Sequence, residues 1–106
     1  MSDFCTKVQQ LGKGIGSPSR YKILEVLMDG PKTVGELVDA VQLSQPAVSQ
    51  HLATLKSCDL VSCSKKGQEV EYILNARYML EILKNLTSDV TRCKSKNESV
   101  SAELAA

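Results

Sequence analysis

The stretch that decides the fold reads SQPAVSQHLATLKSCDLV and runs from Ser44 to Val61. Its apolar residues Val48, Leu52 and Leu55 are spaced four and three positions apart, which places them on one face of an α-helix. The positions between them carry amides, hydroxyls and one imidazole, and no carboxylate occurs before Asp59. Because an ordinary surface helix carries Glu and Lys at such positions, this composition points to a specific partner.

The segment before this helix predicts a second helix and a tight turn. Thr33 and Glu36 have the spacing of a capping box, in which each side chain bonds the backbone N–H of the other residue. The residues expected to face inward from this helix are apolar: Val34, Leu37, Val38 and Val41. Residues 42–44 then form a three-residue turn, and Ser44 is expected to cap the next helix. Asp59 lies where that helix must end, a position that often takes a positive φ.

The outer segments add two helices at the start, a hairpin, and a helix at the end. A first helix is predicted from the apolar stripe Phe4, Val8, Leu11 and Ile15, and the glycines of residues 12–16 weaken its end. A second helix is predicted to begin at Pro18 and to stop at Gly30. Residues 61–64 and 70–74 alternate as two strands around the polar turn Lys65-Lys66-Gly67-Gln68. A last helix starts at about residue 76, and its stripe contains Met79, Leu83, Leu86 and Val90.

The order α-α-α-α-β-β-α predicts a mainly α fold with a β-hairpin wing, that is, a winged helix-turn-helix. Residues 1–93 form one domain in this prediction, its first and last helices serve dimerisation, and residues 94–106 form a flexible tail. With only one Phe, three Tyr and no Trp, the core is small, so we expect a homodimer.

A helix-turn-helix reads DNA with its second helix, and this explains the polar face of residues 44–57. Amides and hydroxyls bond base edges and phosphates, whereas carboxylates are repelled by the phosphates. The lysines at the hairpin tip are expected to contact backbone phosphate. His51 bonds either DNA or a group within the helix-turn-helix. The candidate DNA-binding residues are Ser44, Gln45, Ala47, Ser49, Gln50, His51, Lys65 and Lys66.

Composition excludes several other classes of protein. The net charge of +1 does not by itself indicate nucleic-acid binding, although a local basic patch is compatible with it. No apolar run approaches the length of a membrane span, and no signal peptide is recognised, so we expect a cytoplasmic protein with no membrane partner. One histidine, no interpretable catalytic pair and no glycine-rich phosphate loop argue against an enzyme.

Residues 17–74 resemble the winged-helix core of the ArsR/SmtB family of bacterial metalloregulators. The strongest match is residues 44–55, SQPAVSQHLATL, which resemble the family's recognition-helix pattern S-x-x-S-x-H-L-x-x-L through Ser49, His51, Leu52 and Leu55. The resemblance implies a homodimeric transcriptional repressor that binds a palindromic operator of double-stranded DNA and is released by an inducer.

The four cysteines suggest what that inducer is. The resemblance to cadmium- and lead-sensing members places Cys58 at one ligand position at the end of the recognition helix, with Thr54 at the other, and makes Cys93 a candidate tail ligand. Cys5 is a further candidate. Three thiolates suit a soft ion such as Cd(II), Pb(II) or As(III).

Two alternatives remain open at this point. The cysteines are purely structural in one of them, with Cys63 pointing into the core beside Val61. The chain is then a repressor of this family without metal sensing. In another alternative, the winged helix binds a protein and no longer binds DNA.

Overall fold

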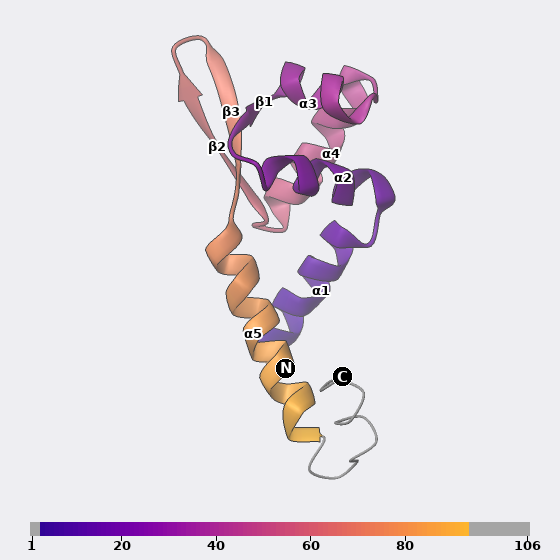
Figure 1. Cartoon of the computed structure of the whole chain (residues 1–106), viewed down its shortest axis with the longest axis vertical. Coiled ribbons are helices and arrows are strands. Elements are labelled where there is room, and N and C mark those ends of the chain that lie inside the picture. The colour runs from indigo at the N-terminus through magenta and orange to yellow at the C-terminus, as the bar shows by residue number, and fades with distance from the viewer. Residues whose placement is uncertain (1–2, 94–106) are drawn as a thin grey trace.

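The computed structural model describes residues 3–93, and the predicted flexible tail lies outside these residues. The elements, in chain order, are α1 (Asp3–Ile15), α2 (Pro18–Leu27), β1 (Lys32–Thr33), α3 (Val34–Val41), α4 (Gln45–Ser57), β2 (Val61–Lys66), β3 (Glu69–Leu74) and α5 (Ala76–Cys93). This is the predicted winged helix-turn-helix with one additional strand, β1. Helices α2 to α4 and the sheet form a head, from which α1 and α5 extend on one side (Figure 1).

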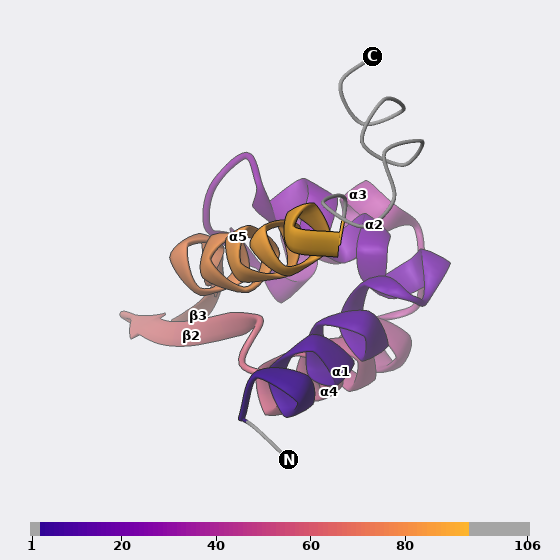
Figure 2. The same ribbon diagram turned by 90° about the horizontal axis from the view of Figure 1, so that it is seen from below.

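The core lies where α2, α3 and α4 meet, and the residues just after α4 close it. Its fully buried side chains are Ile23, Leu24, Leu37, Val48, Leu52, Leu55, Cys58, Leu60, Val61 and Ile82. The predicted stripe of α4 is therefore confirmed. In the view from below, the projecting helices α1 and α5 lie in front of the head (Figure 2).

The predicted helix caps are all present. Ser17 Oγ accepts the Arg20 N–H at 3.3 Å, and Ser44 Oγ accepts the Ala47 N–H at 3.3 Å. Thr33 and Glu36 form the capping box, in which Thr33 donates its backbone N–H to Glu36 Oε1 at 2.9 Å. These bonds satisfy backbone donors that the first turn of a helix leaves free, so each helix begins at a fixed residue.

The first helix ends at Ile15, inside the glycine-containing residues 12–16 where the prediction places its end. Gly14 is buried, and a Cβ added there would lie 2.2 Å from Leu60 Cδ1. The absence of a side chain at Gly14 therefore lets α1 pack closely against the segment after α4. The helix is closed by Arg20, whose guanidinium donates to the Lys13 carbonyl at 2.9 and 3.2 Å.

The sheet has the order β1-β3-β2 and is antiparallel throughout. In the hairpin, Lys66 lies opposite Glu69, so only Gly67 and Gln68 form the turn, with Gly67 at φ 63°. The prediction that Lys65 and Lys66 belong to the turn is thus wrong, because strand pairing continues through both lysines. Strand β1 was not predicted, since two residues are too short to display an alternating pattern.

No helix among residues 3–93 is long and apolar enough to cross a membrane.

Candidate DNA-reading surface

Helices α3 and α4 form the predicted helix-turn-helix. Gln42 closes α3 in the left-handed conformation with φ 58°, and its N–H bonds the Val38 carbonyl. Leu43 then leads directly to Ser44, the cap of α4. The predicted three-residue turn is confirmed.

The polar face of α4 is open while its apolar face is fixed in the core. Val48, Leu52 and Leu55 are fully buried, whereas the side chains before and between them are accessible. Of the predicted DNA-binding residues on this helix and its cap, four are exposed and two are half-buried; the exposed ones are Ser44, Gln45, Ser49 and Gln50, and the half-buried ones are Ala47 and His51. The helix therefore presents amides and hydroxyls on a rigid support.

The hydrogen bonding of Ser44 and His51 bears on how each could contact DNA. Ser44 Oγ accepts the Ala47 N–H, which leaves its hydroxyl hydrogen for donation to a phosphate. Within residues 3–93 no hydrogen bond is made by the His51 ring. The structure thus shows no bond by which the His51 ring braces the helix-turn-helix within these residues, and a contact of His51 with DNA stays a prediction.

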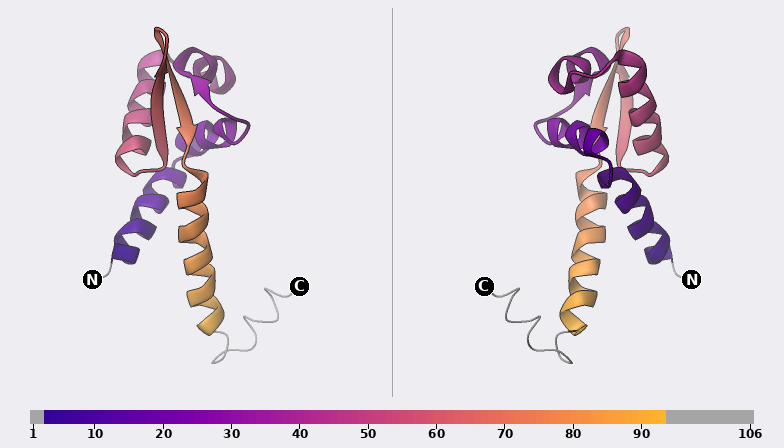
Figure 3. Two further views of the ribbon diagram at one scale, coloured as in Figure 1. Left: turned by 90° about the vertical axis from the view of Figure 1, so that its left-hand side faces the viewer. Right: turned by 90° about the vertical axis from the view of Figure 1, so that its right-hand side faces the viewer.

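The wing brings its tip to the same end of the head as the start of α4. Because β2 follows α4 after a short link and runs back along it, the hairpin tip and the first turn of α4 both lie away from α1 and α5 (Figure 3). Lys65 and Lys66 are exposed there. Lys66 Nζ lies 3.6 Å from Glu71 Oε1, while Lys65 makes no ion pair within the part of the chain that the structure describes.

The four cysteines are not brought together in one chain. Cys58 is a core residue with 1% of its surface exposed, whereas Cys5 is half-buried on α1 and Cys93 is exposed at the end of α5. Among residues 3–93 no group of three side chains of the metal-binding kinds (His, Cys, Asp or Glu) is close enough to hold an ion. A ligand set of Cys58, Cys93 and Cys5 thus stays a prediction without support from the geometry of a single chain.

Cys63 lies on the same face of β2 as Val61, as the alternation predicts, but it is not part of the core. Its side chain is half-buried, and Lys56 Nζ approaches Cys63 Sγ at 3.3 Å from the outer face of α4. The side chain that fills the core is instead Cys58, which lies at the point where α4 ends.

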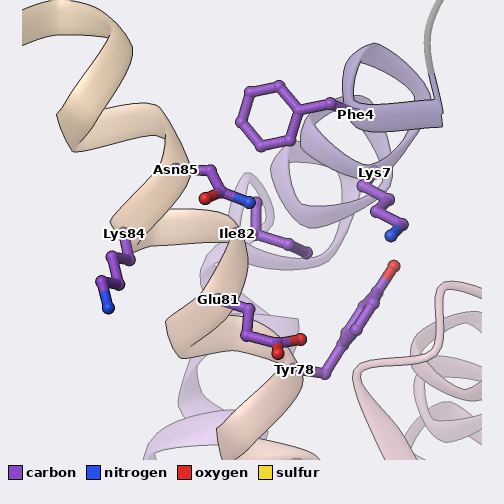
Figure 4. Close-up of a pocket in the computed structure, with 7 residues that line it drawn as sticks. All are labelled: Phe4, Lys7, Tyr78, Glu81, Ile82, Lys84 and Asn85. Atoms are coloured by element: carbon purple, nitrogen blue, oxygen red, sulfur yellow. The ribbon is translucent and has the colours of Figure 1, made fainter.

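The two projecting helices carry apolar side chains that one chain only partly covers. On α5, Met79 and Ile82 are buried, whereas Leu83 and Val90 of the predicted stripe are 41% and 43% exposed. A hollow of about 330 Å³ lies between α1 and α5, with Phe4 and Ile82 among the side chains that line it (Figure 4). At its edge, Lys7 Nζ lies 5.9 Å from the centre of the Tyr78 ring.

Two residues of the wing were missed by the sequence analysis. Glu71 forms an ion pair with Lys66 across the hairpin, and its only sequence signal is an acidic residue on the face of β3 that points away from Tyr72 and Leu74. Asn75 bonds the segment after α4, and its only signal is an asparagine directly before a helix.

Comparison with known proteins identifies the class. The sequence profile of a family described as bacterial regulatory protein, arsR family, matches residues 17–62. The transcriptional repressor SdpR of Bacillus subtilis is 40% identical over 63 residues, which are 59% of this chain and 70% of that protein. The transcriptional activator HlyU of Vibrio cholerae is 40% identical over 83 residues, 76% of this chain and 77% of the relative.

Solved structures agree with the sequence relatives. The structure of HlyU from Vibrio cholerae covers 81% of this chain and 97% of its own, with a TM-score of 0.67 and 38% identity. The NMR structure of the cadmium metal-sensor CmtR from Mycobacterium tuberculosis has a TM-score of 0.60 and 33% identity, over 67% of this chain and 74% of that one.

The fold and its exposed reading helix define a DNA-binding transcriptional regulator, a class of protein that is not enzymatic. The chain belongs to the ArsR/SmtB family of bacterial regulators.

Proposed function

We propose that the chain is a homodimeric transcriptional repressor that binds a palindromic operator and is released by an inducer. The observation that carries this proposal is the first half of α4, where exposed Gln45, Ser49 and Gln50 are held by a fully buried apolar face. A rigid helix with exposed donors and acceptors is what reading base edges in a major groove requires.

The proposed dimer rests on the exposed apolar residues of α5 and α1. Leu80, Leu83 and Val90 of α5 are 64%, 41% and 43% exposed, and Ile15 of α1 is 40% exposed. Several exposed apolar side chains on two neighbouring helices are typical of a surface that another protein covers. Packing two copies along α1 and α5 leaves both reading helices accessible, because the start of α4 lies at the other end of the molecule (Figure 1).

A twofold dimer explains a palindromic operator. Its two reading helices enter major grooves about one helical turn apart, roughly 34–36 Å, or a multiple of that distance. Repression is favoured by the relative SdpR, whose name describes a transcriptional repressor, while HlyU is named an activator. A transcription assay on the chain's own promoter distinguishes these two directions of regulation.

For the inducer, the related CmtR is a cadmium sensor, and a soft ion bound by thiolates is one candidate. Cys5 and Cys93 lie on the two helices that the proposed dimer joins, so thiolates of two copies would have to complete such a site. The burial of Cys58 within the core favours the second candidate, a repressor of this family that does not sense metal.

Selection of bound duplexes from a random pool, followed by mobility shift and sedimentation, tests the proposal. We expect an enriched palindrome bound by two chains. Gln50→Ala should weaken binding to that duplex by about 1–3 kcal/mol if Gln50 makes a bidentate base contact, with little change on random DNA. A chain that enriches no duplex supports the protein-binding alternative instead.

A further inference from the structure

Asn75, the residue between β3 and α5, is bonded on three sides to the segment that follows the reading helix. Its backbone N–H donates to the Leu60 carbonyl at 2.9 Å, and its Nδ2 donates to the Asp59 carbonyl at 2.8 Å. Its Oδ1 accepts the Ser62 hydroxyl at 2.8 Å. One residue thus joins the end of α4, the start of β2 and the start of α5.

The side chain of Asn75 does not cap its own helix, although Asn75 occupies the cap position of α5. The Asn75 carbonyl accepts the Met79 N–H at 3.1 Å, which makes Asn75 the cap residue of α5. An asparagine at this position ordinarily turns its side-chain oxygen towards the first free N–H groups of its own helix. Here Oδ1 accepts from Ser62, so the amide is used to hold other elements together.

The carbonyls that Asn75 contacts have a fixed direction relative to α4. The Leu60 N–H bonds the Leu55 carbonyl at 3.0 Å and the Asp59 N–H bonds the Lys56 carbonyl at 3.0 Å, with Asp59 at φ 62°. These two hydrogen bonds around a left-handed residue form the Schellman motif that ends a helix. The Asp59 and Leu60 carbonyls that Asn75 contacts are therefore held in fixed positions at the end of α4.

We propose that Asn75 is a positioning residue that fixes the angle between the reading helix α4 and α5, and thereby sets the half-site spacing that the dimer reads. This inference rests on the proposed function, since α5 must lie in the dimer interface. Within that dimer, each α5 is held by its partner, so the bonds of Asn75 to Asp59 and Ser62 determine where each α4 points.

The experiment measures the affinity of each variant for the duplex selected by the wild-type protein and for duplexes whose half-sites are moved by one base pair. One base pair shifts a half-site by about 3.4 Å along the axis. Asn75→Ala removes both side-chain bonds, and Ser62→Ala removes only the bond to Oδ1, which keeps the test valid if the first variant folds poorly. Ser17→Ala is the matched control, because it removes a cap from α2 without touching the link between α4 and α5.

The wild-type protein and Ser17→Ala should share one preferred spacing. For Asn75→Ala we expect the ratio of affinities between the preferred and the altered spacing to fall by about fivefold, the lower end of ordinary coupling between sites, with a smaller fall for Ser62→Ala. Unfolding and dimer dissociation are measured on every variant. An unchanged ratio in folded, dimeric Asn75→Ala and Ser62→Ala overturns the inference while the proposed function stands. If the wild-type protein itself selects no two-fold duplex, the proposed function and this inference both fail.

Discussion

Gly14 of α1 lies directly against Leu60, the third residue after the end of the reading helix. A Cβ at Gly14 would lie 2.2 Å from Leu60 Cδ1 and 3.3 Å from Leu55 Cδ2, and both leucines are fully buried. Since Leu55 and Leu60 also hold the end of α4 in place, the contact joins the first helix to the support of the DNA-reading helix.

Gly14→Ala should therefore destabilise the protein. An added methyl group in a packed core costs about 1–3 kcal/mol, which exceeds the gain of about 0.5–1 kcal/mol from replacing a helical glycine by alanine. Gly12→Ala is the matched control, because nothing lies within 4 Å of a Cβ there and only the gain should remain. Urea unfolding measures both; equal stability of the two variants would contradict the close approach of Gly14 to Leu60.

The capping box of α3 predicts a contribution to stability that acid removes. The hydrogen bond from the Thr33 N–H lowers the pKa of Glu36 below its ordinary value of 4.5. A carboxylate with a lowered pKa stabilises the fold above its unfolded pKa, and this contribution is lost as the pH falls through the folded pKa. Glu36→Gln should thus be less stable than the wild-type protein at pH 7 but equal to it in strong acid.

Urea unfolding of both proteins between neutral pH and pH 3 checks this expectation. A difference between wild type and Glu36→Gln that stays constant over the whole range would mean that the charge of Glu36 does not stabilise α3.

The wing lysines should differ in their effect on DNA binding. Each phosphate contact contributes about 0.9 to the slope of log affinity against log salt. Lys65→Ala should lower the slope by about this amount, whereas Lys66→Ala should lower it less, because Lys66 already faces Glu71 at 3.6 Å. Glu71→Gln should strengthen binding at low salt by releasing Lys66. Slopes that are identical in all three variants and the wild-type protein would place the wing away from the phosphates.

Two cysteines should differ in how replacement by serine affects stability. Cys58→Ser places a hydroxyl in the core and should lower the free energy of unfolding by about 1–3 kcal/mol, while Cys93→Ser at the exposed end of α5 should leave it unchanged. If a soft ion is the inducer, Cys93→Ser should also abolish release of DNA by Cd(II) or As(III). Release at an unchanged midpoint would exclude Cys93 as a ligand.

Much of the fold was predictable because local signals agree with the tertiary structure. The capping box at Thr33, the cap at Ser44 and the left-handed end at Asp59 each depend on neighbours a few residues away. The packing role of Gly14 was not predictable, because it depends on a contact with Leu60, which is far away in sequence. A sequence read locally shows only that glycine weakens a helix.

The candidate site was predictable only where its residues depend on a local pattern within one helix. Exposure of Gln45, Ser49 and Gln50 followed from the helical period. The bond from Asn75 to Asp59 and the ion pair of Lys66 with Glu71 depend on which strands meet and in what register. No pattern within one segment determines that register, so these partners became visible only in the structure.

If two copies of α4 read one symmetric operator, a hydroxyl-radical footprint on the selected duplex should show two protected patches of backbone related by a twofold axis. The centres of the contacted grooves should lie about one helical turn or a multiple apart. A single patch, or uniform protection along the duplex, would contradict this symmetric reading.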